Sequence, residues 1–408
     1  MRAVIQDRYG APEDALHVVD DLERPTANED EVLVKVHAST VTRGEAMGVR
    51  FKEYRFTRVF VGIRRPRRPI CGMEFAGRVE EVGPAVSGFK VGDKVFGIDN
   101  ATCAEYGAVG ENRAIQRKPA GLSFEEAAAI PDGALLALTC LKPAYPLEGK
   151  SVLVYGAAGS VGTAAVQLLT QHFNAASVTA VCDTKDVELV RGLGAHHVID
   201  RLNEDFTKNG KTYDVIFDAV GKHSFRLCRH SLTPRGIYVS MDLGYGYHLP
   251  FLGLITKLFG KKRAAVGIGR YRKEDLGLIK DLVEAGKYRP VIDCTYSMDE
   301  YVEAVTYVES GQKTGSVVIR VAGVERLGGR SERAQHFRRM GEGGIGACLA
   351  SRMLCGDTPS PSTSETISSL VTAASTAGCP SRTGAALTTQ GRRFEPVTAH
   401  SFTVIPAD

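Results

Sequence analysis

The stretch Ser151 to Gly162, SVLVYGAAGSVG, restricts the possible folds more than any other part of the chain. Val152 to Tyr155 predict a short buried strand, residues 156–162 a glycine-rich turn, and residues 163–171 a helix with apolar residues at helical spacing. A strand that leads through such a turn into a helix offers free backbone N–H groups to a phosphate. The order therefore predicts a phosphate-binding turn in an α/β domain.

The small residues of this turn have separate expected tasks. Gly159 lets the backbone approach a pyrophosphate, and Gly162 lets the helix pack closely on the strand. An alanine stands where the first glycine of G-x-G-x-x-G is usual. A glycine-rich turn that binds no ligand is the alternative. The residues predicted to bind a cofactor here are Gly156, Ala157, Gly159, Ser160, Val161 and Gly162.

The residues after the next apolar run bear on the choice of cofactor. Asp183 follows the run 178–182 at the place where an acid that binds the ribose is expected. A carboxylate there suits NAD, because it accepts a hydrogen bond from the 2′-hydroxyl and repels a 2′-phosphate. Lys185 and Arg201 are cations that suit NADP instead. These residues alone leave both cofactors open.

Composition indicates a water-soluble protein with room for two domains in 408 residues. A formal net charge of +4 favours neither nucleic acid nor a membrane as the main partner. Nine cysteines without a C-x-x-C pair suit reduced thiols. The N-terminus resembles no signal peptide, and no apolar run is long enough to span a bilayer. We therefore expect a cytoplasmic protein with no membrane span.

The periodicity of the chain changes twice. Residues 1–125 contain short strands separated by glycine-rich turns and predict a β-rich domain, a partly open barrel. Residues 126–289 alternate buried strands with helices, which predicts a doubly wound parallel sheet covered on both faces. Residues 290–322 return to the first domain with a helix and a last strand. The expected fold class is α/β in two domains.

Residues 323–408 have a different composition. They contain no lysine, nine Arg against seven Asp and Glu, and much Ser, Thr, Gly and Ala without a sustained period. Such a segment predicts a disordered, low-complexity tail. A shifted reading frame or an engineered fusion would produce the same composition, so no function is assigned to it.

Five motifs together resemble the zinc-independent branch of the medium-chain dehydrogenase/reductase superfamily, the quinone oxidoreductases of the zeta-crystallin type. The resemblance covers residues 1 to about 322 in the order of the family. The motifs are CGMEFAGRVEEVG (71–83), FKVGDKVFG (89–97), GAAGSVG (156–162), YDVIFDAVG (213–221) and GQKTGSVVIRV (311–321).

The resemblance implies a GroES-like catalytic domain and a Rossmann domain, usually in a homodimer. It implies hydride transfer from NADPH, with NADH as an alternative, to quinones or α,β-unsaturated carbonyl compounds. Zinc-dependent relatives carry a histidine where this chain has Met73, and a cysteine near the 42–45 stretch, which has none. A thioether and a hydroxyl do not form a tetrahedral zinc site, so no metal is expected.

The resemblance also suggests residues near the substrate. Thr42 and Glu45 lie where quinone oxidoreductases carry an Asn and an acidic residue; they either contact a substrate carbonyl or only hold the loop. Tyr54 is a further candidate donor. Residues at strand ends are expected beside the nicotinamide and its ribose: Ala219, Val220, Met241 and Ile268.

Two surface segments and two other functions remain as alternatives. The arginines of 64–68 either form a solvated loop or attract anions, but nucleic acid is not expected as a partner. Residues 251–259, followed by three cations, either dock on a membrane or a subunit, or form an edge helix. The other functions are a metal-free alcohol or aldehyde oxidoreductase and a nucleotide-sensing protein that binds RNA or a partner with little turnover.

Overall fold

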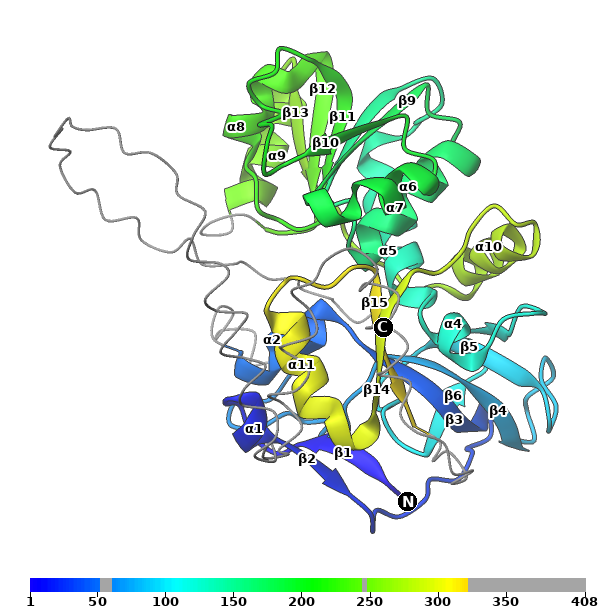
Figure 1. Ribbon diagram of the computed structural model, residues 1–408. Helices are drawn as coiled ribbons and strands as arrows, with labels where there is room; N and C mark the ends of the chain where they lie inside the picture. The colour runs from blue at the N-terminus through cyan, green and yellow to red at the C-terminus, as the bar shows by residue number, and fades with distance from the viewer. Residues whose placement is uncertain (52–60, 244–247, 322–408) are drawn as a thin grey trace, which may run out of the picture. The chain divides into compact units, whose positions relative to one another are not determined.

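The computed structural model describes residues 1–51, 61–243 and 248–321, and the structural statements that follow concern these residues (Figure 1). Tyr54 and the predicted tail 323–408 lie outside the described residues. Two large sheets account for most of the strands, and a two-stranded antiparallel ribbon, β1 (Ala3–Gln6) with β2 (Leu16–Val19), accompanies them.

The first large sheet combines strands from early and late parts of the sequence. Its order is β14-β15-β3-β4-β5-β7, and β6 also pairs with β3. All pairs are antiparallel except β14 with β15. The strands are β3 (Glu31–Val41), β4 (Glu74–Val82), β5 (Lys94–Ile98), β6 (Tyr106–Gly110), β7 (Ala114–Arg117), β14 (Ile292–Ser297) and β15 (Ser316–Arg320).

Alternate residues of β3 contribute to the core of the GroES-like domain. Val32, Val34 and Val36 of β3 pack in one cluster with Phe75 and Ile115, as the period of two in a strand requires. The helices associated with this sheet are α1 (Pro12–Ala15), α2 (Arg43–Arg50), α4 (Phe124–Ala128) and α11 (Tyr301–Glu309). β15 pairs with β3, so the late strands complete the sheet.

The second large sheet is entirely parallel, in the order β10-β9-β8-β11-β12-β13. Its strands are β8 (Ser151–Tyr155), β9 (Ser177–Cys182), β10 (His197–Asp200), β11 (Tyr213–Asp218), β12 (Leu232–Ser240) and β13 (Arg263–Val266). The helices in this part of the chain are α5 (Pro131–Cys140), α6 (Ser160–Gln171), α7 (Val187–Gly192), α8 (Phe225–Cys228), α9 (His248–Phe259) and α10 (Lys273–Glu284), of which α10 contacts α5 and also β7 of the first sheet. The predicted α/β fold class is confirmed: a GroES-like domain and a Rossmann-type parallel sheet.

Both faces of the parallel sheet are buried. Val152 and Val154 lie in one hydrophobic cluster, whereas Leu153, between them, lies in another together with Ile216 and Tyr238. The chain adds β9 and β10 on one side of β8, and then β11, β12 and β13 on the other side. Parallel sheets bind ligands at such a switch point, beyond the carboxyl ends of the strands. The ends of β8 and β11 therefore mark the place for a cofactor.

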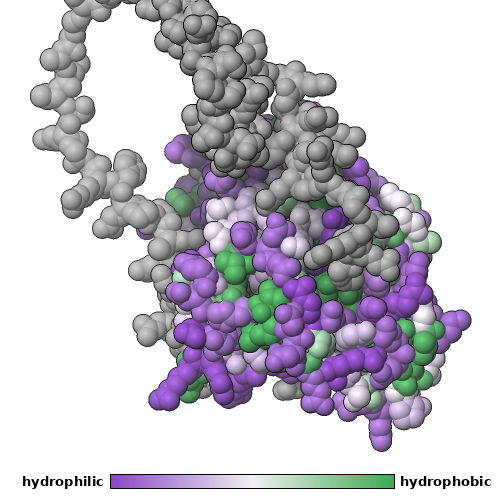
Figure 2. Space-filling view, turned by 60° about the horizontal axis from the view of Figure 1, so that its bottom comes forward, coloured by the Kyte–Doolittle hydropathy of each residue, from purple (hydrophilic) through white to green (hydrophobic). Residues whose placement is uncertain are grey.

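Exposed hydrophobic side chains are unevenly distributed. Figure 2 shows a mostly hydrophilic face on which hydrophobic residues appear in separate groups. Within the described residues, five of the twelve exposed large hydrophobic side chains fall instead on the single helix α9. No helix in the described ranges combines the length and the apolar character that a membrane crossing needs.

Candidate cofactor and substrate site

The turn after β8 is closed so tightly that side chains would not fit at two of its glycines. Gly156 has a φ of +76°, and a Cβ atom there would lie 2.1 Å from Cγ2 of Val220. A Cβ atom on Gly162 would lie 2.1 Å from the carbonyl oxygen of Gly156. The N–H groups of Gly156 and Ala157 both donate to the carbonyl of Val181 on β9 (3.1 and 3.0 Å), which fixes the turn on the sheet.

Helix α6 begins at the end of this turn, with Gly159 as its N-cap. The N–H of Thr163 donates to the carbonyl of Gly159 at 2.8 Å and closes the first helical bond. The preceding N–H groups, of Ser160, Val161 and Gly162, have no acceptor within the helix. Unpaired N–H groups and the positive end of the helix dipole favour a phosphate at this position. The predicted turn therefore has the geometry of a dinucleotide cradle.

Asp183 and Arg201 lie together beyond β9 and β10. Arg201 donates through Nη2 to Oδ2 of Asp183 at 3.0 Å, and its Nε also pairs with Oδ1. Both side chains are partly exposed. The hydrogen bond to Asp183 raises the pKa of the Arg201 guanidinium. From the sequence, Asp183 favours NAD and Arg201 favours NADP. In the structure the two side chains form one ion pair.

Lys185 points to another part of the chain. Its Nζ donates to the carbonyl of Gln312 at 2.6 Å and to the hydroxyl of Thr314 at 3.2 Å. The same late segment meets the cofactor turn, since the N–H of Gly315 donates to the carbonyl of Ala158 at 2.7 Å. Lys185 therefore connects β9 to this segment.

The structure shows a further cation near the ribose position that was not predicted from the sequence. Lys222 follows β11 and the turn at Gly221, and the neighbouring charges of Arg43 and Arg201 act on it. Desolvation first, and these like charges second, lower the pKa of Lys222. Its position after a strand end is the only sequence signal that could have identified it. Arg43 and Arg201 are the cations and Asp183 and Asp218 the acids whose charges act on Lys222.

The turn after β11 is held by Asp218. Its carboxylate accepts the N–H groups of Val220 (3.1 Å), Gly221 (2.8 Å) and His223 (2.8 Å). Ala219 is buried in the core and Val220 lies against Gly156. The structure thereby brings the 219–221 turn beside the cofactor turn, and the position of Ala219 and Val220 beside the nicotinamide ribose stays a prediction.

The two later strand-end residues differ. Met241 directly follows β12 and is buried in the hydrophobic core. Ile268 lies two residues beyond the end of β13, and its side chain is 55% exposed. Their predicted positions beside the nicotinamide stay predictions.

Thr42 and Glu45 form a capping box at the start of α2. The Thr42 hydroxyl accepts the N–H of Glu45 at 3.2 Å, and Oε2 of Glu45 accepts the N–H of Thr42 at 2.9 Å. This reciprocal pair satisfies two N–H groups at the helix start. Both residues therefore hold the loop, one of the two roles that the sequence left open.

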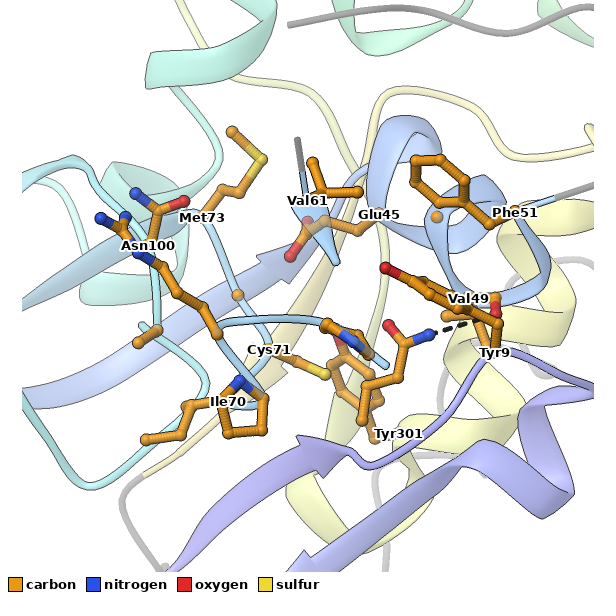
Figure 3. A pocket seen from close by; sticks show the side chains of 17 residues that line it. Tyr9, Glu45, Val49, Phe51, Val61, Ile70, Cys71, Met73, Asn100 and Tyr301 are labelled. Atoms are coloured by element: carbon orange, nitrogen blue, oxygen red, sulfur yellow. Dashed lines mark hydrogen bonds between the residues drawn. The ribbon is translucent and has the colours of Figure 1, made fainter. Parts of the chain in front are cut away.

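Glu45 also lines a pocket of about 180 Å³ in the GroES-like domain. Figure 3 shows its carboxyl group directed into the pocket, toward the space between Met73 and Val61. Burial raises the pKa of Glu45 to about 7, against hydrogen bonds from Thr42 that lower it. Glu45 can therefore hold or release a proton near neutral pH. Other lining residues include Tyr9, Phe51, Ile70, Cys71, Asn100 and Tyr301.

A buried chain of polar groups connects the two domains. Its residues were not predicted from the sequence. Glu74 accepts the hydroxyl of Thr40 and, at 2.7 Å, the N–H of Asp132 at the start of α5. Asp132 in turn accepts the hydroxyl of Tyr271 at 2.7 Å. Burial, and then the mutual charge, raises the pKa of Glu74. Charged residues inside otherwise apolar runs, Glu74 in GMEFAG and Asp132 in IPDGALLAL, are the signal that could have found it.

The donor set around the pocket does not fit a catalytic zinc ion. Of the pocket residues, Cys71 and Glu45 offer a thiol and a carboxylate, while Met73 offers only a thioether. Burial also raises the pKa of Cys71 to about 12, which opposes the thiolate that zinc requires. No cluster of three metal-ligating side chains occurs in the part of the chain that the structure describes. We therefore derive no step through a metal.

Comparison with known proteins agrees with this fold. A family described as alcohol dehydrogenase GroES-like domain matches residues 28–143, and one described as zinc-binding dehydrogenase matches residues 193–319. The chain is 33% identical to 2-methylene-furan-3-one reductase of Solanum lycopersicum over 331 residues, 78% of this chain and 79% of the relative. It is 29% identical to the chloroplastic NADPH-dependent alkenal/one oxidoreductase of Arabidopsis thaliana, with the same coverage.

A solved structure supports the same placement. The quinone oxidoreductase from Coxiella burnetii is 27% identical, with a TM-score of 0.69 over 79% of this chain and 99% of that one. The chain therefore belongs to the medium-chain dehydrogenase/reductase superfamily. Within it, the chain falls in the branch of quinone oxidoreductases and alkenal reductases and is an NAD(P)H oxidoreductase of that type.

Proposed function

We propose that the protein reduces quinones or α,β-unsaturated carbonyl compounds with NADPH, without a metal. The observation that carries this proposal is the position of Glu45, whose carboxyl group lies on the wall of a pocket whose donor set does not suit zinc and whose pKa burial raises to about 7. Conjugated acceptors spread the arriving negative charge themselves, so they need no Lewis acid. They do need a proton, and Glu45 is a group in the pocket that can supply it near neutral pH.

The nicotinamide cofactor, when bound, supplies the hydride. The turn 156–162 would hold its pyrophosphate through the N–H groups at the start of α6. An enone would accept the hydride at its β carbon, and the electron pair of its double bond would move toward the carbonyl. Protonated Glu45 then gives its proton to the substrate and recovers one from solvent. A quinone takes the same hydride and proton and becomes a hydroquinone.

The test is acceptor-dependent oxidation of the cofactor by the full chain after treatment with a chelator. NADPH and NADH are supplied separately with a panel of quinones and enones. We expect loss of the reduced cofactor that survives chelation. Cofactor binding without oxidation by any acceptor would contradict the proposal and favour the nucleotide-sensing binding protein. Oxidation with aldehydes alone would favour the alcohol or aldehyde oxidoreductase.

The preference for NADPH is proposed on the cations around Asp183. Arg201 neutralises the carboxylate that would repel a 2′-phosphate, and Lys222 lies close enough for its charge to interact with both Asp183 and Arg201. Arg201→Gln is expected to raise the KM for NADPH about 10- to 100-fold and to leave that for NADH within a few-fold, because one charge-assisted contact is lost. Steady-state kinetics with each cofactor measures the ratio.

The matched control is Arg191→Gln, which removes a similar ion pair, with Glu188, on the exposed surface of α7. We expect it to change neither KM. If Arg201→Gln leaves the NADPH to NADH ratio at its wild-type value, Arg201 does not bind the 2′-phosphate and the proposed preference is wrong. A cytoplasmic location and a homodimeric assembly, both expected from the sequence, are also proposals here.

A further inference from the structure

Helix α9 is apolar on two faces, and the residues that the structure describes cover only one of them. Leu249 and Thr256 are buried and Leu252 and Gly253 partly so, at the spacing of one helix face that packs on β13. The opposite stripe is open to solvent. Its members are Phe251 (68% exposed), Leu254 (56%), Ile255 (40%), Leu258 (64%) and Phe259 (85%).

The covered face of α9 already protects the edge of the parallel sheet. β13 is the last strand of that sheet. The N–H of Ala264 donates to the hydroxyl of Thr256 at 3.0 Å, and the carbonyl of Ala264 lies 3.2 Å from where a Cβ atom of Gly253 would be. Backbone groups at this edge therefore have α9 as their neighbour, which disfavours the addition of another strand. An occupant of this surface must contact the exposed side chains of α9.

The charges in the stretch of sequence that contains α9 are of one sign. Residues 243–273 contain seven Lys and Arg and no Asp or Glu. Lys257, Lys261 and Arg263 are exposed. Lys262 donates to the carbonyl of Arg229 at 2.8 Å, so the exposed Arg229 lies beside this group of cations. A symmetric contact between two copies would bring these cations together, because each copy presents the same patch. A negatively charged surface is complementary to them.

We propose that α9 and the basic segment 261–263 dock the protein on the surface of a membrane that contains anionic lipids. The exposed stripe, with Phe251, Leu258 and Phe259, enters the boundary between headgroups and acyl chains. Lys257, Lys261 and Arg263 contact the lipid phosphates. With 12 residues, α9 is too short to cross the bilayer and lies along its surface. The inference does not depend on the proposed reaction.

The test is co-sedimentation of the full chain with two kinds of vesicle, phosphatidylcholine alone and phosphatidylcholine mixed with phosphatidylglycerol. We expect at least tenfold tighter binding to the mixed vesicles, weakened by salt. Leu258→Asp is expected to weaken this binding at least tenfold. The matched control is Leu202→Asp, since both leucines are 64% exposed, and it should bind like the wild type.

A second variant carries both Lys257→Glu and Lys261→Glu. Its affinity for mixed vesicles should fall at least tenfold, and its affinity for phosphatidylcholine vesicles should change little. Equal binding of the wild type to both vesicles would overturn the role of anionic lipids. No vesicle binding, together with a wild-type dimer that Leu258→Asp converts to a monomer in sedimentation equilibrium, would show that a second copy covers α9. An equal loss in Leu202→Asp would show that the effect is not specific to α9.

Discussion

Gly162→Ala is expected to weaken the binding of both NADPH and NADH at least tenfold and to lower the free energy of unfolding by about 1–3 kcal/mol. The added Cβ atom would lie 2.1 Å from the carbonyl oxygen of Gly156 and 2.7 Å from Cα of Ala157. These are backbone atoms of the turn, so the turn must shift. The N–H groups at the start of α6 then no longer point toward the pyrophosphate. Titration of cofactor fluorescence and thermal unfolding measure the two effects.

Gly159→Ala is the matched control for the turn. A Cβ atom there would have the Gly156 carbonyl oxygen as its nearest neighbour, at 3.7 Å, an ordinary contact. The variant should unfold at the wild-type temperature. A weaker cofactor affinity with unchanged stability would then report the approach of the pyrophosphate to residue 159 itself. If Gly162→Ala binds both cofactors as the wild type does, the turn is not the cofactor site.

Glu45→Gln is expected to lower kcat for enones about 10²- to 10³-fold with little change in KM, since it removes the proton donor. The Gln side-chain oxygen can still accept the N–H of Thr42, which keeps the start of α2 in place. The pKa of Glu45 is raised to about 7, so the protonated, active form of the wild type disappears above that pH. The rate should therefore fall as pH rises through 7 in the wild type and not in Glu45→Gln.

Thermal unfolding against pH separates this role from helix capping. The folded-state pKa of Glu45 lies above its ordinary value of 4.5, so its contribution to stability is complete below pH 4.5 and is lost as pH rises to about 7. Glu45→Gln should remove this slope whether or not Glu45 is the donor. Wild-type kcat in Glu45→Gln, with the slope removed, would show that Glu45 only caps α2.

Local features of the site are readable from the sequence because their parts are near one another in the chain. The turn 156–162 joins a strand and a helix that follow one another directly, so its residues predict its geometry. Thr42 and Glu45 have the three-residue spacing of a capping box, and the structure confirms that they hold the loop. Apolar runs such as 178–182 predict the parallel sheet for the same reason.

Contacts between distant segments could not be predicted in this way. Asp132 meets Glu74 58 residues away, and Lys185 meets Thr314 129 residues away. Asp183 and Arg201 follow neighbouring strands, but only the side-chain conformations show that they pair with each other. Burial sets the pKa of Glu45, and burial depends on how the pocket is closed by residues such as Ile70 and Tyr301. The raised pKa of Glu45 therefore could not be predicted from the sequence.

The most direct measurement follows the hydride itself. The chelator-treated full chain is incubated with an enone and NADPH that carries deuterium at the transferable position of the nicotinamide ring, and the product is analysed by mass spectrometry. The proposed reaction predicts one deuterium at the β carbon of the saturated ketone and a solvent proton at the α carbon. Oxidised cofactor with no deuterium in the product, or no reduced product from any enone or quinone, would contradict it.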